Sequence, residues 1–138
     1  MNAARTTWFG MSGASAIVLG IARTLTPDPS GVGTHVQLGL PRCFFLRSTG
    51  LPCPACGLTT AFAHMARGEA AQAASANALG VLLFAIVCCS VPLGVWAGVR
   101  DLPLAETLAR FHAAKSCSAI AIIGLVYWCA RVTWIVVH

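Results

Sequence analysis

A stretch of the chain without any charged side chain, residues 70–99, sets the strongest limit on the fold. A helix needs about 20 predominantly apolar residues to cross a bilayer, and residues 75–99 exceed that length. Only 9% of all residues are charged and 57% are hydrophobic, whereas about a quarter of the residues of soluble domains are charged. The sequence therefore predicts an integral membrane protein.

Two further apolar segments, residues 6–24 and 116–137, are expected to span the membrane as well. The charge-free part of the first is about 25 Å long as a helix, which is just enough for a thin bilayer. A signal peptide is the alternative for this segment, because the small residues of Gly20-Ile-Ala22 resemble a cleavage site. The last segment contains Arg131, whose charged end can reach the interface along its own stem. We therefore predict a single all-α membrane domain over residues 1–138, with three transmembrane helices.

The longest polar region, residues 25–72, contains the loop between the first two spans. Its first part is rich in proline and glycine, which predicts irregular structure. A short amphipathic helix is expected to start at Cys53-Pro54-Ala55-Cys56, because proline favours the first turn of a helix. The expected apolar face of this helix carries Leu58, Phe62 and Met65, and the expected polar face carries Thr60, His64 and Arg67.

Small residues recur at every fourth position in the first two spans, where they let helices approach closely. They are Ser12, Ala16 and Gly20 in the first span, and Gly94 and Gly98 in the second. Pro92 removes a backbone hydrogen bond from the second span, so we expect a bend near Cys88 and Cys89.

The seven cysteines fall into two groups. Four lie in apolar runs, where a thiol behaves as a small hydrophobic side chain; these are Cys88, Cys89, Cys117 and Cys129. The other three, Cys43, Cys53 and Cys56, lie in a loop rich in turn-forming residues, and two of them share a C-x-x-C. Packing explains these three poorly, so we expect any chemistry of the protein to involve them.

Three interpretations of Cys43, Cys53 and Cys56 remain open. A disulfide from Cys43 to Cys53 or Cys56 would hold the loop together in an oxidising compartment. In a thiol–disulfide oxidoreductase, Cys53 near a helix N-terminus would be the catalytic nucleophile and Cys56 the resolving thiol. In a metal site, His64 would complete a Cys₃His set for zinc, although it lies two helical turns beyond Cys56.

The remaining side chains argue against several classes of function. The sequence has no phosphate-binding loop, no H-E-x-x-H and only four carboxylates, so hydrolase chemistry is unsupported. Its net charge of +5 is dispersed, which favours contact with anionic lipid headgroups over nucleic acid. His35 and His112 are isolated and are expected to bind nothing. The leading hypothesis is a non-enzymatic accessory subunit whose surface loop is organised by the three cysteines through a disulfide or a metal. It is expected to contact lipid and either a membrane-protein partner or a second copy of itself.

The sequence from Cys43 to Asn77 resembles a bacterial membrane-protein family known as domain of unknown function 2752. The shared pattern is a cysteine, a short gap, Thr-Gly-x-Pro-Cys-Pro-x-Cys-Gly-x-Thr, and then a glycine and an asparagine ahead of a long apolar helix. The matching residues are Cys43, Thr49, Gly50, Pro52, Cys53, Pro54, Cys56, Gly57, Thr59, Ala61, Gly68 and Asn77. Arg131 is similar to an arginine near the end of the family's last helix. The resemblance implies a small helical protein of the bacterial inner membrane, without an established reaction.

Two positions depart from the family pattern. Thr60 stands where the family has an arginine, and Ala78 stands where it has a proline. If that arginine stabilises a thiolate in the family, its replacement weakens the redox interpretation here.

Basic residues near the span ends are slightly more numerous on the N-terminal side of the membrane than on the side of the cysteine loop. By the positive-inside rule, this predicts a cytoplasmic N-terminus and an external cysteine loop. The basic residues counted are Arg5, Arg100, Arg110 and Lys115 on the first side, and Arg23, Arg67 and Arg131 on the second.

Overall fold

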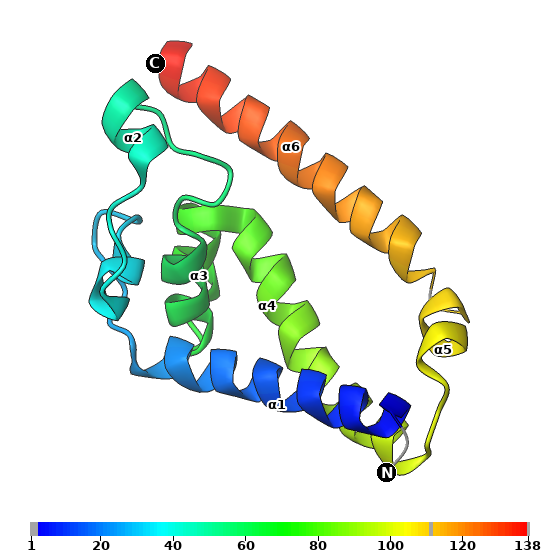
Figure 1. Cartoon of the computed structure of the whole chain (residues 1–138). Helices are drawn as coiled ribbons and strands as arrows, with labels where there is room; N and C mark the ends of the chain where they lie inside the picture. The colour runs from blue at the N-terminus through cyan, green and yellow to red at the C-terminus, as the bar shows by residue number, and fades with distance from the viewer. Residues whose placement is uncertain (1–2, 111, 138) are drawn as a thin grey trace.

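The computed structural model describes residues 3–110 and 112–137, and no strand occurs among them. Three long helices make up most of the molecule, namely α1 (Ala3–Thr24), α4 (Ala70–Val99) and α6 (Ala113–Val137) (Figure 1). The two connections contain shorter helices, which are η1 (Thr34–Leu38), α2 (Phe44–Thr49), α3 (Leu58–Met65) and α5 (Leu104–Arg110). The prediction of an all-α chain is confirmed.

Two helices of the described chain, α4 and α6, are long and apolar enough to cross a membrane. They contain the expected spans 75–99 and 116–137. Only 11% of the apolar part of α4 and 6% of that of α6 is buried inside the molecule, so both helices present apolar side chains to their surroundings. The other expected span, residues 6–24, lies in α1, which is not one of the two. Its charge-free stretch is short, because Arg5 and Arg23 lie on either side of residues 6–22.

Helices α1 and α4 pack antiparallel through small residues, because Ser12 lies against Gly94 and Ser15 lies against Ser90. A Cβ added to Gly94 would lie 3.0 Å from Cβ of Ser12, so the glycine is what permits the approach. Hydroxyl groups add hydrogen bonds across this contact, because Ser12 Oγ donates to the Val91 carbonyl at 2.7 Å and Ser90 Oγ donates to Ser15 Oγ at 2.7 Å. The expected role of small residues is confirmed here, whereas Gly20 has nothing within 4 Å of its Cβ position.

Helix α4 is interrupted at Asn77, where φ is −163° and ψ is 108°. These are the angles of an extended residue, and Asn77 is the only residue from 70 to 99 outside the helical region. Its Oδ1 accepts a hydrogen bond from the Gly80 N–H at 3.2 Å and so caps the segment that follows. We expected the irregularity near Pro92, but the backbone there keeps helical dihedral angles.

Helix α3 packs against the first half of α4 and forms the small buried core. Ala61, Ala73 and Ala76 are buried together there, with Met65 and Val81 packed against them. The predicted start of this helix at the Cys-Pro-Ala-Cys sequence is wrong, because α3 begins at Leu58. The prediction that Thr60 lies on a polar face is also wrong, since its side chain is fully buried.

Helix α6 runs back along the molecule, so that its C-terminal end lies near α2 (Figure 1). Gly124 faces the side chain of Leu79, and Tyr127 Oη accepts a hydrogen bond from the Ala78 N–H at 3.3 Å. A proline at position 78 would have no N–H to donate. These contacts bring the second half of α6 to the start of α4, beside the cysteine loop.

Candidate functional site

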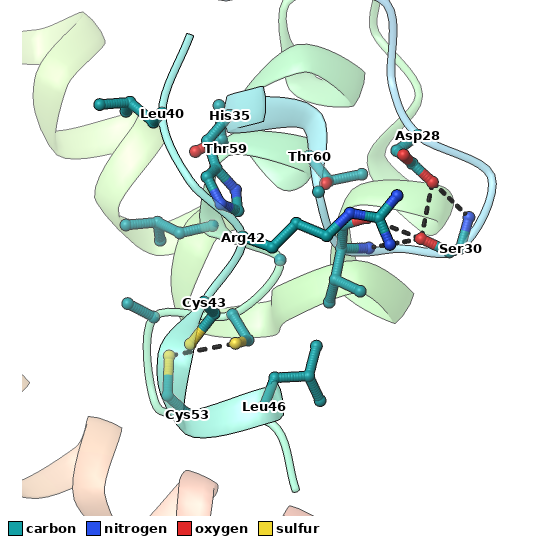
Figure 2. Close-up of a pocket in the computed structure, with 16 residues that line it drawn as sticks. Asp28, Ser30, His35, Leu40, Arg42, Cys43, Leu46, Cys53, Thr59 and Thr60 are labelled. Carbon is teal, nitrogen blue, oxygen red and sulfur yellow. Dashed lines mark hydrogen bonds between the residues drawn. The ribbon is translucent and has the colours of Figure 1, made fainter. Parts of the chain in front are cut away.

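The thiols of Cys43, Cys53 and Cys56 meet in one cluster, which we call the cysteine cluster. Their Sγ atoms all lie within 4.8 Å of one another, and Cys53 Sγ is 3.1 Å from Cys56 Sγ (Figure 2). Because a disulfide bond is about 2.05 Å long, these are separate thiols in contact. Among residues 3–110 and 112–137, no histidine or carboxylate joins the group.

The Cys-Pro-Ala-Cys sequence forms a tight turn ahead of α3. The Cys56 N–H donates to the Cys53 carbonyl at 3.0 Å, which closes the turn and brings the two thiols to the same side. Gly57 follows with φ of 87°, a left-handed conformation that separates this turn from the helix. A Cβ on Gly57 would lie 2.5 Å from the Ala76 carbonyl oxygen and 2.8 Å from that of Gly31. Only glycine fits here, and Gly57 is the N-cap of α3, so Cys53 lies four residues before the N-cap of the helix.

Main-chain carbonyls of the turn are held by side chains from α4 and α6. Asn77 is fully buried, and its Nδ2 donates to the carbonyls of Pro54 at 3.2 Å and Cys56 at 3.1 Å. From α6, Arg131 Nη1 donates to the Cys56 carbonyl at 3.4 Å, and Trp128 Nε1 donates to that of Pro52 at 2.7 Å. Asn77 and Arg131, which the family resemblance selected, thus act on the backbone that carries the thiols.

Helix α2 brings Cys43 back to the other two cysteines. Cys43 directly precedes the helix, and Gly50 ends it in a left-handed conformation with φ of 73°. Thr49 Oγ1 donates to the Phe45 carbonyl at 2.7 Å and accepts from the Leu51 N–H at 3.2 Å, which fixes the reversal of the chain. The Phe45 ring packs edge-on against Trp128, with centroids 6.3 Å apart.

Two of the thiols differ in acidity because their surroundings differ. The backbone amide of Leu46 lowers the pKa of Cys43, because it stabilises the thiolate. Burial raises the pKa of Cys56 to about 12, and contact with Cys53 adds to this effect. Of these two thiols, Cys43 therefore ionises first, whereas Cys56 holds its proton.

A cavity of about 490 Å³ opens beside the cysteine cluster, and all three cysteines line it. Its other walls come from the loop that contains Asp28, from the segment that contains Arg42, and from Thr59 of α3 (Figure 2). The volume lies within the range of small-molecule sites in proteins.

Hydroxyl groups stabilise the part of the cavity wall that contains Asp28 and Thr60. Thr34 Oγ1 and Thr60 Oγ1 are 2.8 Å apart, and both side chains are fully buried. Thr34 also accepts the Asp28 N–H at 2.9 Å. Thr60, one of the two departures from the family pattern, thus connects α3 to this loop.

The structure does not bring His64 to the cysteine cluster. Its Nδ1 lies 2.5 Å from Oε2 of Glu69, in the turn between α3 and α4. That turn passes through Gly68, which has φ of 80° and donates its N–H to the Met65 carbonyl at 3.0 Å. His64 therefore links α3 to the start of α4 through Glu69, and it does not contact the cysteine cluster.

Sequence reasoning missed three residues that form the site. Trp128 lies in the predicted last span, residues 116–137, and no sequence signal marks its hydrogen bond to the Pro52 carbonyl. Thr34 lies in a segment expected to be irregular, and its partner Thr60 was placed on the wrong face. Arg42 directly precedes Cys43 in the sequence, and this position could have predicted a positive charge beside the cysteine cluster.

Fold and site together define a class: small helical proteins with apolar helices long enough to cross a membrane and a three-cysteine cluster beside them. Residues 43–91 match the family model described as "Protein of unknown function (DUF2752)". The resemblance is confirmed over this segment, which contains all three cysteines and Asn77. No curated protein and no solved structure matches the chain.

Proposed function

We propose that the chain is a small multi-pass membrane protein that binds a soft metal ion, zinc in the first place, through Cys43, Cys53 and Cys56. The observation that carries the proposal is the approach of the three Sγ atoms to within 4.8 Å of one another. In a tetrahedral site with Zn–S bonds of about 2.3 Å, sulfur atoms lie about 3.8 Å apart. Small side-chain rotations are enough to reach that arrangement, and an all-thiolate set favours zinc or copper(I) over hard cations.

The acidity of the thiols is compatible with metal binding. The thiolate is the form that coordinates a metal, and the lowered pKa of Cys43 makes it available first. Burial keeps Cys56 protonated in the metal-free protein, but a bound cation deprotonates a coordinating thiol outright. Binding therefore releases protons, and affinity falls as the pH is lowered.

Insertion into the bacterial inner membrane is part of the proposal, and the length and apolar character of α4 and α6 support it. We infer that α1 is a third span, because it packs antiparallel to α4 and its 22 residues extend about 33 Å. The cysteine loop and the end of α6 then share one side, and the N-terminus and α5 share the other. We propose that the cysteine side is external.

We further propose that the protein works as an accessory or interaction subunit. Exposed apolar side chains along α6 support contact with lipid and with a membrane-protein partner or a second copy of the chain; they include Ile122, Leu125, Val126, Val136 and Val137. Mild solubilisation from native membranes tests this role. A partner is expected to copurify, and a monodisperse protein without companions would contradict it.

Metal content of the purified protein tests the main proposal. The chain is expected to bind about one zinc ion in detergent, and Cys43→Ser, Cys53→Ser and Cys56→Ser are each expected to lose most of it. Cys117→Ser and Cys89→Ser are matched controls, because both thiols are exposed on apolar helices outside the cluster. Equal metal content in all five variants would contradict the proposal.

Thiol–disulfide exchange is a second candidate, favoured by the 3.1 Å contact between Cys53 and Cys56. The Cys43 thiolate would attack one sulfur of a substrate disulfide, forming a mixed disulfide and releasing the first substrate thiol. A second cluster cysteine would then attack Cys43, release the second substrate thiol and leave an internal disulfide. Capture of a mixed disulfide on Cys43 in a variant without either possible resolving thiol, Cys53→Ser combined with Cys56→Ser, together with no metal in the native chain, would favour this candidate over the first.

A further inference from the structure

The cysteine cluster offers a metal three protein ligands and, within the described residues, no fourth. Structural zinc sites have four protein ligands, whereas sites that exchange a ligand keep one position open. All three cysteines line the 490 Å³ cavity, so that the open position faces a space large enough for a small molecule. We infer that a small thiol carrying a carboxylate enters this cavity and supplies the fourth ligand through its sulfur. This inference rests on the metal-binding proposal above.

A soft ion held by three thiolates selects sulfur as its fourth ligand over oxygen donors. Three thiolates and a divalent ion carry a net charge of −1, so a further thiolate needs a cation nearby. Arg42 is the one cavity-lining residue with a permanent positive charge, and Figure 2 shows its side chain reaching from the Cys43 segment across the cavity toward Ser30.

Arg42 is also suited to a second anionic group of the ligand. The acid that shares its cavity, Asp28, receives hydrogen bonds from the Ser30 N–H at 2.9 Å and the Ser30 hydroxyl at 2.6 Å. These bonds lower the pKa of Asp28 most, and the charge of Arg42 lowers it further. In the described part of the chain, no carboxylate lies within ion-pair distance of Arg42. A guanidinium group binds carboxylates well because its donors match their geometry. The carboxylate of the ligand therefore points toward Arg42 while its sulfur points toward the cluster.

His35 is the competing fourth ligand, because it also lines the cavity. Its Nε2 lies 3.2 Å from the Pro41 carbonyl oxygen, and its nitrogens do not belong to the group formed by the three sulfurs. A His35→Gln variant separates the two cases, because it removes the imidazole without changing the cavity greatly.

The test uses the full chain in detergent, loaded with cobalt(II) and titrated with 3-mercaptopropionate and with 2-mercaptoethanol. The sulfur-to-cobalt charge-transfer band is expected to rise by about one third and to saturate, as three thiolates become four. Arg42→Gln is expected to lower the affinity for 3-mercaptopropionate by about two- to fivefold, which is the effect of losing an exposed ion pair. The affinity for 2-mercaptoethanol is expected to fall less, because this ligand has no carboxylate for Arg42 to bind.

Leu40→Trp places a larger side chain in the cavity. This variant is expected to bind cobalt, but its charge-transfer band is expected not to respond to added thiols. Leu38→Trp is the matched control, because Leu38 is on the same segment but lines a separate apolar groove. Loss of the titration in both variants would overturn the cavity as the place of the ligand.

If the charge-transfer band of the cobalt-loaded protein does not change when thiols are added, this inference is overturned and the metal-binding proposal still holds. A resting spectrum that changes in His35→Gln would overturn it as well, because His35 would then be the fourth ligand. A chain that binds no metal would instead overturn the proposed function, and the inference with it.

Discussion

Asn77 Nδ2 lies 3.1 Å from the main-chain oxygen of Cys56, so the interruption of an apolar helix is bonded directly to the peptide that carries a cluster thiol. The same amide group reaches Pro54, while Oδ1 caps the following turn of α4. One fully buried side chain therefore satisfies groups on both sides of the contact between the loop and the helix.

Asn77→Ala is expected to destabilise the protein by about 2–3 kcal/mol, because it leaves buried polar backbone groups without partners. Thermal unfolding in detergent measures the loss, and bound metal is expected to fall with it. Ser75→Ala is the matched control on the same helix, since the Ser75 side chain is exposed and bonds only to Gln72 of its own helix. Equal stability of the two variants would refute this role of Asn77.

Gly57→Ala is expected to be far more harmful than Gly68→Ala, although both glycines have positive φ. At Gly68 a Cβ meets nothing within 4 Å, so only the backbone conformation is strained, at about 1–2 kcal/mol. At Gly57 the Cβ overlaps two carbonyl oxygens, and we expect a loss of about 3 kcal/mol or more, or failure to fold. Urea titration of the two purified variants compares them directly, and similar midpoints would contradict the predicted difference.

Trp128→Phe is expected to loosen α6 from the cysteine loop, because it keeps an aromatic ring beside Phe45 but loses the hydrogen bond to Pro52. The loss is expected to be about 1 kcal/mol and to raise the alkylation rate of the buried Cys56 by about fivefold. Trp96→Phe, on an exposed face of α4, serves as the control. An unchanged alkylation rate would show that α6 does not cover the thiol.

Alkylation of the metal-free protein is expected to separate the cluster thiols by pH. Only the thiolate reacts, so Cys43, with its lowered pKa, is expected to react at lower pH than an ordinary cysteine. Cys56 is expected to react appreciably only as the pH approaches about 12. Because its pKa is raised by folding, its stabilising contribution is complete below the unfolded-state pKa and is lost as the pH rises toward 12. Mass spectrometry of labelled peptides gives the order, and earlier labelling of Cys56 would reverse the assignment.

His64→Gln is expected to leave metal content unchanged, in contrast to the three cysteine variants. His64 pairs with Glu69 in the structure, so its removal affects the connection between α3 and α4. We expect a small loss of stability, at most about 1 kcal/mol for this partly exposed pair. Loss of metal in this variant would restore the Cys₃His interpretation.

Much of the architecture followed from the sequence because it depends on local composition. The charge-free run at 70–99 and the apolar run at 116–137 predicted helices that the structure contains. The turn-rich setting of Cys43, Cys53 and Cys56 predicted that these thiols have a role apart from packing, and the structure brings their sulfurs together.

What sequence reasoning missed depends on contacts between distant segments. Proline after Cys53 predicted a helix start, but the close approach of Ala76 and Gly31 to Gly57 places that start four residues later. Helical periodicity assigned Thr60 to a polar face, whereas its partner Thr34 lies in another segment. No local pattern records such a contact, because each partner is unremarkable in its own neighbourhood.

The hydrogen bonds from Trp128 and Arg131 end on main-chain oxygens of Pro52 and Cys56. During synthesis, the ribosome makes all three cysteines long before it makes α6. These two hydrogen bonds to the loop can therefore form only after the last helix has been made. If the cluster binds metal as proposed, these two hydrogen bonds are absent from any site that is loaded before α6 is made.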